Sequence, residues 1–397
     1  MKKVIFLVDM NAFFISCEAT RNQELKGKPA AVAGDPKNRC GIILAANYEA
    51  RKYGIKTTML VHEAKKLYKD LILVPPDHEF YDMKSREVMN ILSKFTPVIQ
   101  QNSIDEAWLD LTGCESLFGS PLEIAKKIMN SIIEELDLWC SIGISENKFL
   151  AKMASEMKKP LGITQIWKED VKDKIWPLKV REMYGVGKQT EKKLYQLAIY
   201  TIGDIARFDK NLMFKMLGKY GVDLHKLANG IDESPVTESP VHDSKSISRS
   251  TTLPVDIHDI EYAKTILLEL SEQVGLETRK SGLKGRTISI IIKYDDFESI
   301  TRQKAVSPTH LTKEIYQVGV LLLVNNWNIN RGIRLLGIAL CNLVDNSAVQ
   351  LSLFDITNDN KHWAREELLE KTMDAIKQKY GVDKIKRAKS IINLDKS

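Results

Sequence analysis

Three carboxylates stand next to short apolar runs that should form buried strands. Asp9 directly follows the apolar run at residues 4–8, while Asp105 and Glu106 stand where a second expected strand, 106–110, begins. A carboxylate at the end of a buried strand is unfavourable unless it is paired, and a hard divalent cation such as Mg²⁺ provides that pairing through oxygen ligands. Two such ions can activate a hydroxyl nucleophile and stabilise a leaving pyrophosphate. The three side chains are therefore candidate metal ligands, with ordinary polar strand ends as the alternative.

The length and composition indicate a globular chain of several domains. With 397 residues, of which 44% are hydrophobic and 28% charged, the chain is too long for one core, and about two to four domains are expected. No run reaches the roughly 20 apolar residues that cross a bilayer, and Asp9 and Asn11 break the N-terminal run, which we interpret as a strand and not a signal peptide. The five cysteines form no CxxC pair, which argues against a disulfide framework or a zinc site. We therefore expect a cytoplasmic protein with no membrane partner.

The spacing of apolar residues divides the chain into parts of different character. Residues 4–165 mix expected strands with amphipathic helices, and 166–231 are helical and punctuated by glycines. The segment 232–242, DESPVTESPVH, has two prolines and little apolar sequence, which predicts an extended linker. Between 244 and 343 the expected order is βαββαβ, typical of a compact α+β unit with helices on one face of a sheet. The tail at 361–397 is charged and predicted to be helical.

Within these parts the patterns predict individual elements. Strands are expected at 4–8, 28–32, 41–45, 98–102, 106–110, 140–144, 244–252, 286–294, 299–306 and 333–343. Helices are expected at 13–21, 48–53, 62–69, 80–95, 122–136, 147–158, 258–281 and 311–327.

Positive charge is concentrated in one region. The chain has a net charge of +6, and residues 145–198 contain 12 Lys and Arg against 7 Asp and Glu. A surface that contacts a phosphate backbone would show such a surplus, although a solvated lysine-rich face would look the same. Within this region the tract 184–188, YGVGK, places two glycines between helical runs, where backbone N–H groups can approach a phosphate. A simple turn between helices is the alternative.

Five tracts stand in one order along the chain: VDMNAFF, NYEARKYGI, SIDEAWLDLTG, SIGISENKFLAKMASEMKKPLGI and MYGVGKQTEKKL. Their order and spacing are those of the Y-family (translesion) DNA polymerases, and the chain resembles the bacterial branch that includes polymerase IV and the UmuC and MucB types. The resemblance covers residues 1 to about 345 and, more loosely, the tail. It implies an α+β right-hand polymerase with a palm, fingers, a helical thumb that carries a helix–hairpin–helix, and an α+β little-finger domain. The implied boundaries are palm 1–19 and 75–165, fingers 20–74, thumb 166–231, linker 232–242, little finger 243–345, and a clamp-binding peptide with a charged helical tail at 346–397.

The resemblance implies template-directed DNA synthesis of the translesion type, in DNA damage tolerance and repair. A primer 3′-hydroxyl would attack the α-phosphate of a deoxynucleotide, and two Mg²⁺ ions would be held by Asp9, Asp105, Glu106 and the backbone carbonyl of Met10. Little covalent chemistry then falls to side chains, because positioning and charge neutralisation dominate. Asn11 stands where many relatives have a second aspartate, and we expect no loss of metal binding from it.

The same resemblance assigns residues around the incoming deoxynucleotide. Phe14 matches the steric gate, whose ring occupies the space that a ribose 2′-hydroxyl would need, and Phe13 would pack beneath it. Tyr48 and Arg51 share a helix face and would bind the triphosphate together with Lys159, since a guanidinium fork suits phosphate oxygens. Without the family, the two phenylalanines would be ordinary core and the Tyr/Arg pair an ordinary surface pair.

Contacts with DNA and with a sliding clamp are implied further along the chain. The hairpin of the helix–hairpin–helix would be Gly185, Val186, Gly187 and Lys188, and the candidate phosphate contacts of the little finger are Lys245, Arg249, Arg286, Arg331 and Arg334. The peptide Gln350, Leu351, Ser352, Leu353, Phe354 resembles the segment that binds the bacterial sliding clamp, with its last two residues as apolar anchors. The alternative is a segment pinned to its own domain. The expected partners are primer–template DNA, an incoming dNTP and the sliding clamp, with the chain otherwise monomeric.

Two other functions share part of this pattern. A nucleotidyl cyclase uses two metals on a similar palm, but it needs no DNA grip, linker or C-terminal domain. A non-catalytic DNA-binding or clamp-binding protein descended from a polymerase would not need Asp9, Asp105 and Glu106 intact. Primer extension in the presence of Mg²⁺ separates all three.

Overall fold

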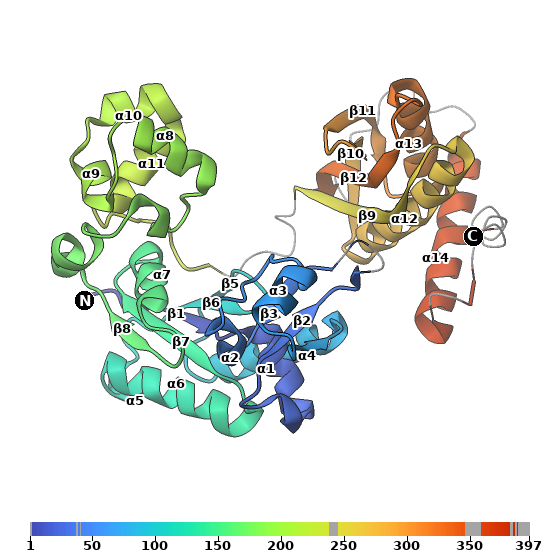
Figure 1. Cartoon of the computed structure of the whole chain (residues 1–397). Coiled ribbons are helices and arrows are strands. Elements are labelled where there is room, and N and C mark those ends of the chain that lie inside the picture. The colour runs from blue at the N-terminus through green and yellow to red at the C-terminus, as the bar shows by residue number, and fades with distance from the viewer. Residues whose placement is uncertain are drawn as a thin grey trace. The chain divides into compact units, whose positions relative to one another are not determined.

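A computed structural model describes residues 2–36, 39, 41–237, 245–345, 359–381, 384–385 and 387 (Figure 1). Backbone contacts divide the chain into two units, one made of Met1–Gly34 and Gly41–Ser239 and the other of Asp35–Cys40 and Pro240–Ser397. The first unit contains a five-stranded and a three-stranded sheet, the second contains a four-stranded sheet, and each unit has its own apolar core. Among the described helices, none combines the length and the apolar content that crossing a membrane requires.

The first unit is built on a five-stranded sheet of order β5-β6-β1-β7-β8. β1 runs antiparallel to both β6 and β7, while β8 runs parallel to β7. Three residues carry no usable periodicity, which is why the sequence pattern does not predict β8. The strands are β1 (Ile5–Met10), β5 (Ile99–Gln101), β6 (Glu106–Asp110), β7 (Cys140–Ser145) and β8 (Ile163–Gln165).

Helices cover both faces of this sheet, which explains why β1 is apolar almost throughout. Phe6 and Val8 pack into the core formed with α4 and α6, whereas Ile5 and Leu7 pack on the side of α7. Alternate residues of a strand face opposite sides, so Asp9 shares the α7 side with Ile5 and Leu7. The helices of this part are α1 (Phe13–Arg21), α4 (His78–Leu92), α5 (Glu115–Phe118), α6 (Pro121–Leu136) and α7 (Lys148–Met157).

A three-stranded sheet of order β3-β2-β4 follows α1 in the chain. The Asn47 side-chain oxygen accepts hydrogen bonds from the backbone N–H groups of Ala50 in α2 (3.0 Å) and Ala30 in β2 (3.0 Å). This N-cap joins α2 to the sheet. The elements are η1 (Gln23–Leu25), β2 (Ala30–Ala33), β3 (Ile43–Ala46), α2 (Tyr48–Arg51), α3 (Val61–Leu67) and β4 (Ile72–Val74).

The part of the first unit that follows β8 is helical, as the sequence predicts. Its core includes Ile175, Leu194 and Ile202, together with Phe149 and Leu150 of α7. The helical part is therefore anchored on the same helix that covers the five-stranded sheet. Its elements are η3 (Lys168–Asp170), η4 (Val171–Ile175), η5 (Val180–Glu182), α8 (Lys188–Gln196), α9 (Ile202–Arg207), α10 (Lys210–Leu217) and α11 (Lys219–Ala228).

The segment 232–237 has no regular secondary structure, as expected of a linker, but it is not wholly solvated. Val236 is buried against Ile5, Leu7 and Trp108. One apolar residue in a proline-containing segment is thus enough to attach the start of the linker to the five-stranded sheet.

The second unit confirms the predicted βαββαβ order. Its four strands form an antiparallel sheet of order β11-β10-β12-β9, and α12 and α13 share a core with one face of that sheet. A last helix, α14 (Asp359–Tyr380), lies beside α12 (Figure 1). Ion pairs join it to α12 and α13, and they include Arg279 to Asp374 (2.6 Å) and Lys313 to Glu366 (2.8 Å). The other elements are β9 (Ser246–Ile257), α12 (Ile260–Lys280), β10 (Leu283–Tyr294), β11 (Ser299–Thr309), α13 (Thr312–Asn326) and β12 (Ile333–Asp345).

Candidate active site

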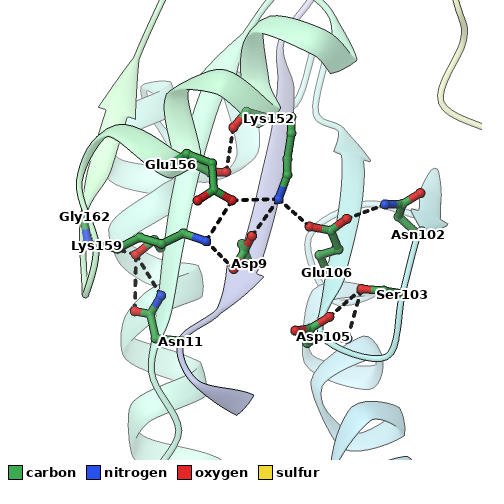
Figure 2. Close-up of polar contacts among 12 residues, drawn as sticks. Asp9, Asn11, Asn102, Ser103, Asp105, Glu106, Lys152, Glu156, Lys159 and Gly162 are labelled. Carbon is green, nitrogen blue, oxygen red and sulfur yellow. Dashed lines mark hydrogen bonds and ion pairs between the residues drawn. The ribbon is translucent and has the colours of Figure 1, made fainter. Parts of the chain in front are cut away.

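The register of the five-stranded sheet brings the three predicted carboxylates together. Asp9 pairs with Glu106 of β6 on one side and with Ser141 of β7 on the other. Asp105 lies in the turn before β6, and its carbonyl oxygen accepts a hydrogen bond from the N–H of Met10 (2.9 Å). Residues far apart in the sequence therefore meet at one end of β1 (Figure 2).

Two lysines contact these carboxylates. The Lys152 ammonium donates to Asp9 Oδ2 (2.9 Å), Glu106 Oε2 (2.7 Å) and Glu156 Oε1 (2.9 Å). The Lys159 ammonium donates to Asp9 Oδ1 (2.8 Å) and Glu156 Oε1 (3.0 Å). Asp9 thus has one lysine on each of its two carboxylate oxygens (Figure 2).

Close packing of α7 on the sheet places these lysines. A Cβ on Gly143 of β7 would lie 1.9 Å from the carbonyl oxygen of Ala151, so only glycine allows this approach. Burial opposes the charge on Lys152, but the carboxylates around it outweigh burial and raise its pKa. The sequence analysis did not single out Lys152. The available signal was its spacing from Glu156, because residues four apart share a helix face.

Asp105 is held apart from the lysines. The Ser103 hydroxyl donates to Asp105 Oδ1 (2.5 Å), and the Asn102 amide bonds the Glu106 carboxylate. The site offers oxygen ligands, which suit a hard divalent cation. Across the described ranges, however, no three His, Cys, Asp or Glu side chains are already gathered around one point. Cation binding therefore requires the carboxylates to exchange their present partners.

A cavity of about 420 Å³ opens beside these groups. The predicted residues that line it come from β1, α1, α2, the turn before β6, β6 itself and the segment after α7: Asp9, Met10, Phe13, Phe14, Tyr48, Arg51, Asp105, Glu106 and Lys159. The lining residues that were not predicted as site residues are Asn11, Ala12, Leu44, Ala45, Thr57, Ser103 and Lys152. The metal and nucleotide candidates of the sequence analysis thus share one space.

Tyr48 and Arg51 present hydrogen-bonding groups to this cavity. The Arg51 guanidinium lies over the Tyr48 ring at 4.8 Å, and its Nε–H donates to the carbonyl of Ala46 (2.9 Å). The Tyr48 hydroxyl is buried and has no hydrogen-bond partner among the described residues. Burial raises the pKa of this phenol, which keeps it a neutral O–H donor. A buried donor without a partner is unfavourable, and a phosphate oxygen would supply the missing acceptor.

Phe14 lies in an aromatic stack. Its ring stacks on Tyr81 with centroids 4.4 Å apart and meets His78 edge-on at 5.8 Å. Tyr81 is itself fixed, because its hydroxyl donates to buried Glu18 (2.7 Å). Phe13 is buried in the main core, with its ring centroid 6.1 Å from that of Phe14. The neighbours of Phe14 therefore restrict its movement away from the cavity.

Asn11 points away from the carboxylates. Its Nδ2–H donates to the Ser141 hydroxyl (3.0 Å), and its Oδ1 accepts from the backbone N–H of Leu161 (3.0 Å). The Asn11 side chain therefore links β7 to the segment that contains Lys159. This role of the amide is structural.

The glycine-rich turn before α8 is ordered by its own contacts. Gly185 has φ +96°, in the left-handed region that favours glycine, and its carbonyl accepts from the Tyr220 hydroxyl (2.6 Å). Val186 is buried in the helical core, whereas Gly187 and Lys188 are exposed. The turn thus exposes backbone groups and one lysine to solvent, while the buried Val186 and the Tyr220 hydrogen bond hold it in place.

The basic candidates of the second unit differ in their surroundings. Arg249 is paired with Glu277 (2.6 Å), and Arg331 is paired with Asp296 and with Glu298 (2.8 Å). Their charge is already offset by neighbours. Within the described structure no ion pair is formed by the remaining candidates, Lys245, Arg286 and Arg334.

The predicted clamp-binding residues lie outside the described residues, as does the end of the predicted linker at 238–242. The clamp-binding residues are Gln350, Leu351, Leu353 and Phe354.

Comparison with known proteins gives consistent matches along the chain. The impB/mucB/samB family matches residues 8–156, the C-terminal domain of that family matches 244–353, and the helix–hairpin–helix motif of the family matches 168–199. The DNA polymerase IV of Clostridium kluyveri is 56% identical over 401 residues, which cover 100% of both chains. The DNA polymerase IV of Alkaliphilus oremlandii is 54% identical and covers 99% of this chain and 100% of its own. Among solved structures, a Y-family DNA polymerase chimera superposes with a TM-score of 0.78 at 29% identity, over 86% of this chain and 100% of the chimera.

Proposed function

This chain belongs to the impB/mucB/samB family and is a Y-family DNA polymerase of the translesion type, and we propose that the cavity beside Asp9 is its active site. The enzyme extends a primer on a template, so it binds primer–template DNA and an incoming dNTP. As in the rest of the family, its activity depends on a divalent metal ion. The observation that carries the proposal is the convergence of separated segments of the chain on one cavity.

The metal-binding groups in this proposal are the carboxylates of Asp9, Asp105 and Glu106 and the carbonyl of Met10, which would hold two Mg²⁺ ions. The pairing of Asp9 with Glu106 across β1 and β6 supports it, as does the predominance of oxygen ligands. When bound, the ions would activate the primer hydroxyl and neutralise the leaving pyrophosphate. The backbone ladder holds the two strand carboxylates in register, so their positions do not depend on the side chains alone.

Tyr48, Arg51 and Lys159 would bind the triphosphate. Arg51 offers a planar fork for phosphate oxygens, and the buried Tyr48 hydroxyl offers a donor that has no partner among the described residues. Lys159, now on Asp9, would move to a phosphate oxygen. These groups orient the α-phosphate toward the primer end, and orientation is a large part of the rate enhancement in such reactions.

Phe14 would select deoxynucleotides. Its ring lines the cavity and is backed by Tyr81, with Phe13 packed beneath it. A ring that cannot move aside excludes a ribose 2′-hydroxyl by steric clash.

DNA would be held by phosphate contacts outside the cavity. In the helix–hairpin–helix these contacts would come from Gly185, Val186, Gly187 and Lys188. The Val186 side chain is buried, whereas Lys188 is exposed. In the second unit Lys245, Arg286 and Arg334, which form no ion pair among the described residues, are better candidates than Arg249 and Arg331. An arginine that already has acidic partners must leave them to bind phosphate.

The remaining assignments follow the family. We propose that the five-stranded sheet and its helices are the palm, 1–19 and 75–165, that 20–74 are the fingers and 166–231 the thumb, and that a linker at 232–242 leads to a little finger at 243–345. Residues 346–397 would hold the clamp-binding peptide and the tail. The enzyme would act in the cytoplasm as a monomer that binds the sliding clamp.

Primer extension tests the active site directly. Asp105→Ala should abolish extension of a primed template in Mg²⁺, because it removes a metal ligand, while DNA affinity should stay close to that of the unaltered enzyme. Asp110→Asn is the matched control at the other end of β6, where the carboxylate bonds the backbone N–H of Thr112 (2.9 Å), and it should retain extension. Normal turnover by Asp105→Ala would show that the site is elsewhere.

A further inference from the structure

Lys152 occupies a position that the proposed metal site also needs. Its ammonium lies 2.9 Å from Asp9 Oδ2 and 2.7 Å from Glu106 Oε2, and its side chain is only 11% exposed. One ammonium therefore bridges two of the carboxylates that the proposed function assigns to metal ions. The bridge comes from α7, whose close packing on Gly143 fixes the helix that carries it.

A divalent ion and this ammonium compete for the same oxygens. A cation coordinated by Asp9 and Glu106 would lie within a few ångströms of the lysine, where like charges in a partly buried site repel strongly. The oxygens that bond Lys152 would also have to turn from an N–H donor to a metal. Metal binding therefore has to displace the ammonium from its present position between Asp9 and Glu106.

Glu156 is an alternative ion-pair partner for the displaced Lys152 ammonium. The Lys152 ammonium already bonds Glu156 Oε1 at 2.9 Å, and the Glu156 side chain is 50% exposed. Glu156 lies one helical turn from Lys152, outside the set of proposed metal ligands. Moving from Asp9 and Glu106 toward Glu156 would keep the lysine paired, so the displacement leaves no buried unpaired charge.

We propose that Lys152 competes with divalent cations for Asp9 and Glu106 and so lowers the metal affinity of the free enzyme. This inference rests on the proposed metal site. It goes beyond that site by assigning to α7 a resident cation that the metal must replace, with Glu156 as its alternative partner.

The test is a titration of the full-length protein with Mn²⁺, without DNA or nucleotide. Electron paramagnetic resonance of the free ion measures how much Mn²⁺ has bound. Lys152→Met removes the charge and keeps much of the side-chain volume, and it should bind Mn²⁺ about tenfold more tightly than the unaltered protein. Lys152→Gln should change the affinity in the same direction. Lys152→Arg keeps the charge and should restore weak binding, and Lys158→Met, an exposed neighbour, is the matched control and should have no effect.

The outcomes separate this inference from the proposed metal site. Asp9→Asn should weaken Mn²⁺ binding in both the unaltered and the Lys152→Met backgrounds. If it does, but folded Lys152→Met and Lys152→Gln bind Mn²⁺ no more tightly than the unaltered protein, the competition is disproved and the metal site stands. If Asp9→Asn leaves Mn²⁺ binding unchanged, the metal site itself is wrong, and the inference falls with it.

Discussion

Single side chains in the cavity are held by partners that differ in how easily they are exchanged. Asp9 and Glu106 bond lysines, which a competing cation or anion can displace. Phe14 instead is held by ring contacts with Tyr81 and His78, which no small ligand replaces. The charged groups are therefore suited to binding and release, whereas the aromatic ring is suited to a fixed boundary.

At this scale we predict that Phe14→Ala admits ribonucleotides. Removing the ring opens the volume that a 2′-hydroxyl needs, and the ratio of rNTP to dNTP incorporation efficiency should rise by roughly 10²-fold. Single-nucleotide incorporation kinetics with matched rNTP and dNTP measure this ratio. Ile15→Val, a conservative core change in the same helix, should leave it unaltered. An unchanged ratio in Phe14→Ala would mean that the ring is only part of the core.

Two elements outside the cavity depend on contacts that their own sequence does not contain. The turn before α8 is braced by Tyr220 of α11, whose hydroxyl bonds the Gly185 carbonyl. α14 is attached to α12 by ion pairs, which include Asp374 with Arg279 and Lys377 with Glu272. Glu370 of α14 is only 3% exposed and lies between Arg279 (3.3 Å) and Arg387 (2.6 Å), which follows α14 in the chain. The first contact shapes the turn before α8, and the second fixes the last described helix.

For the turn before α8 we predict a DNA affinity that falls steeply with salt and depends little on duplex sequence. Each phosphate that the protein neutralises should contribute about −0.9 to the log–log salt slope, so Lys188→Ala should make the slope shallower by about that amount. Fluorescence anisotropy of a labelled primer–template across a KCl series measures it. Lys174→Ala, where the lysine is paired with Asp170 (3.0 Å), is the control and should keep the slope. Strong discrimination among duplex sequences would refute the contact model.

For α14 we predict that Glu370→Ala detaches the helix. The change removes a carboxylate partner from the buried Arg279 and from the partly buried Arg387, and breaking a buried ion pair costs about 3 kcal/mol or more. Hydrogen exchange should then rise across 359–380 while the sheet from β9 to β12 stays protected. Leu368→Ala, at a position that is 66% exposed on the same helix, should have no such effect. Equal protection of α14 in both variants would show that other contacts hold it.

At the scale of the whole molecule, a polymerase that grips DNA mainly through phosphates dissociates readily. A tether to a ring on the DNA raises its effective concentration at the primer end. The segment 350–354, between β12 and α14 in the chain, is the proposed tether, with Leu353 and Phe354 as anchors that are worth roughly 1.5–3 kcal/mol each when buried.

We therefore predict that a Leu353→Ala, Phe354→Ala double variant keeps its clamp-free activity but loses stimulation by the sliding clamp. Primer extension on a circular primed template, with and without loaded clamp, measures both quantities. Thr357→Ala, just beyond the segment, should behave like the unaltered enzyme. If the double variant unfolds, the segment belongs to the core of its own domain; if it folds and is stimulated normally, the clamp contact lies elsewhere.

Local sequence was enough to predict most of the fold, and the order of its motifs led to several residues of the cavity. The βαββαβ order between β9 and β12 follows from apolar periodicity, and the strands that carry Asp9 and Glu106 follow from short apolar runs. The likeness to a polymerase family then identified Tyr48, Arg51 and Phe14, which do line one cavity with the carboxylates. These features depend on residues close together in the chain or on a recognisable order of motifs.

Tertiary structure alone decided which charges meet. Lys152 bonds Asp9 across 143 positions of sequence, and Asn11 bonds Ser141 across 130, so neither pairing leaves a local pattern. The three residues of β8 form a strand because β7 offers its edge, and Val236 leaves solvent because Ile5 and Leu7 offer an apolar surface. Residue type and spacing determine what a segment can form, but an ion pair or an edge pairing exists only when the fold has brought both partners within contact distance.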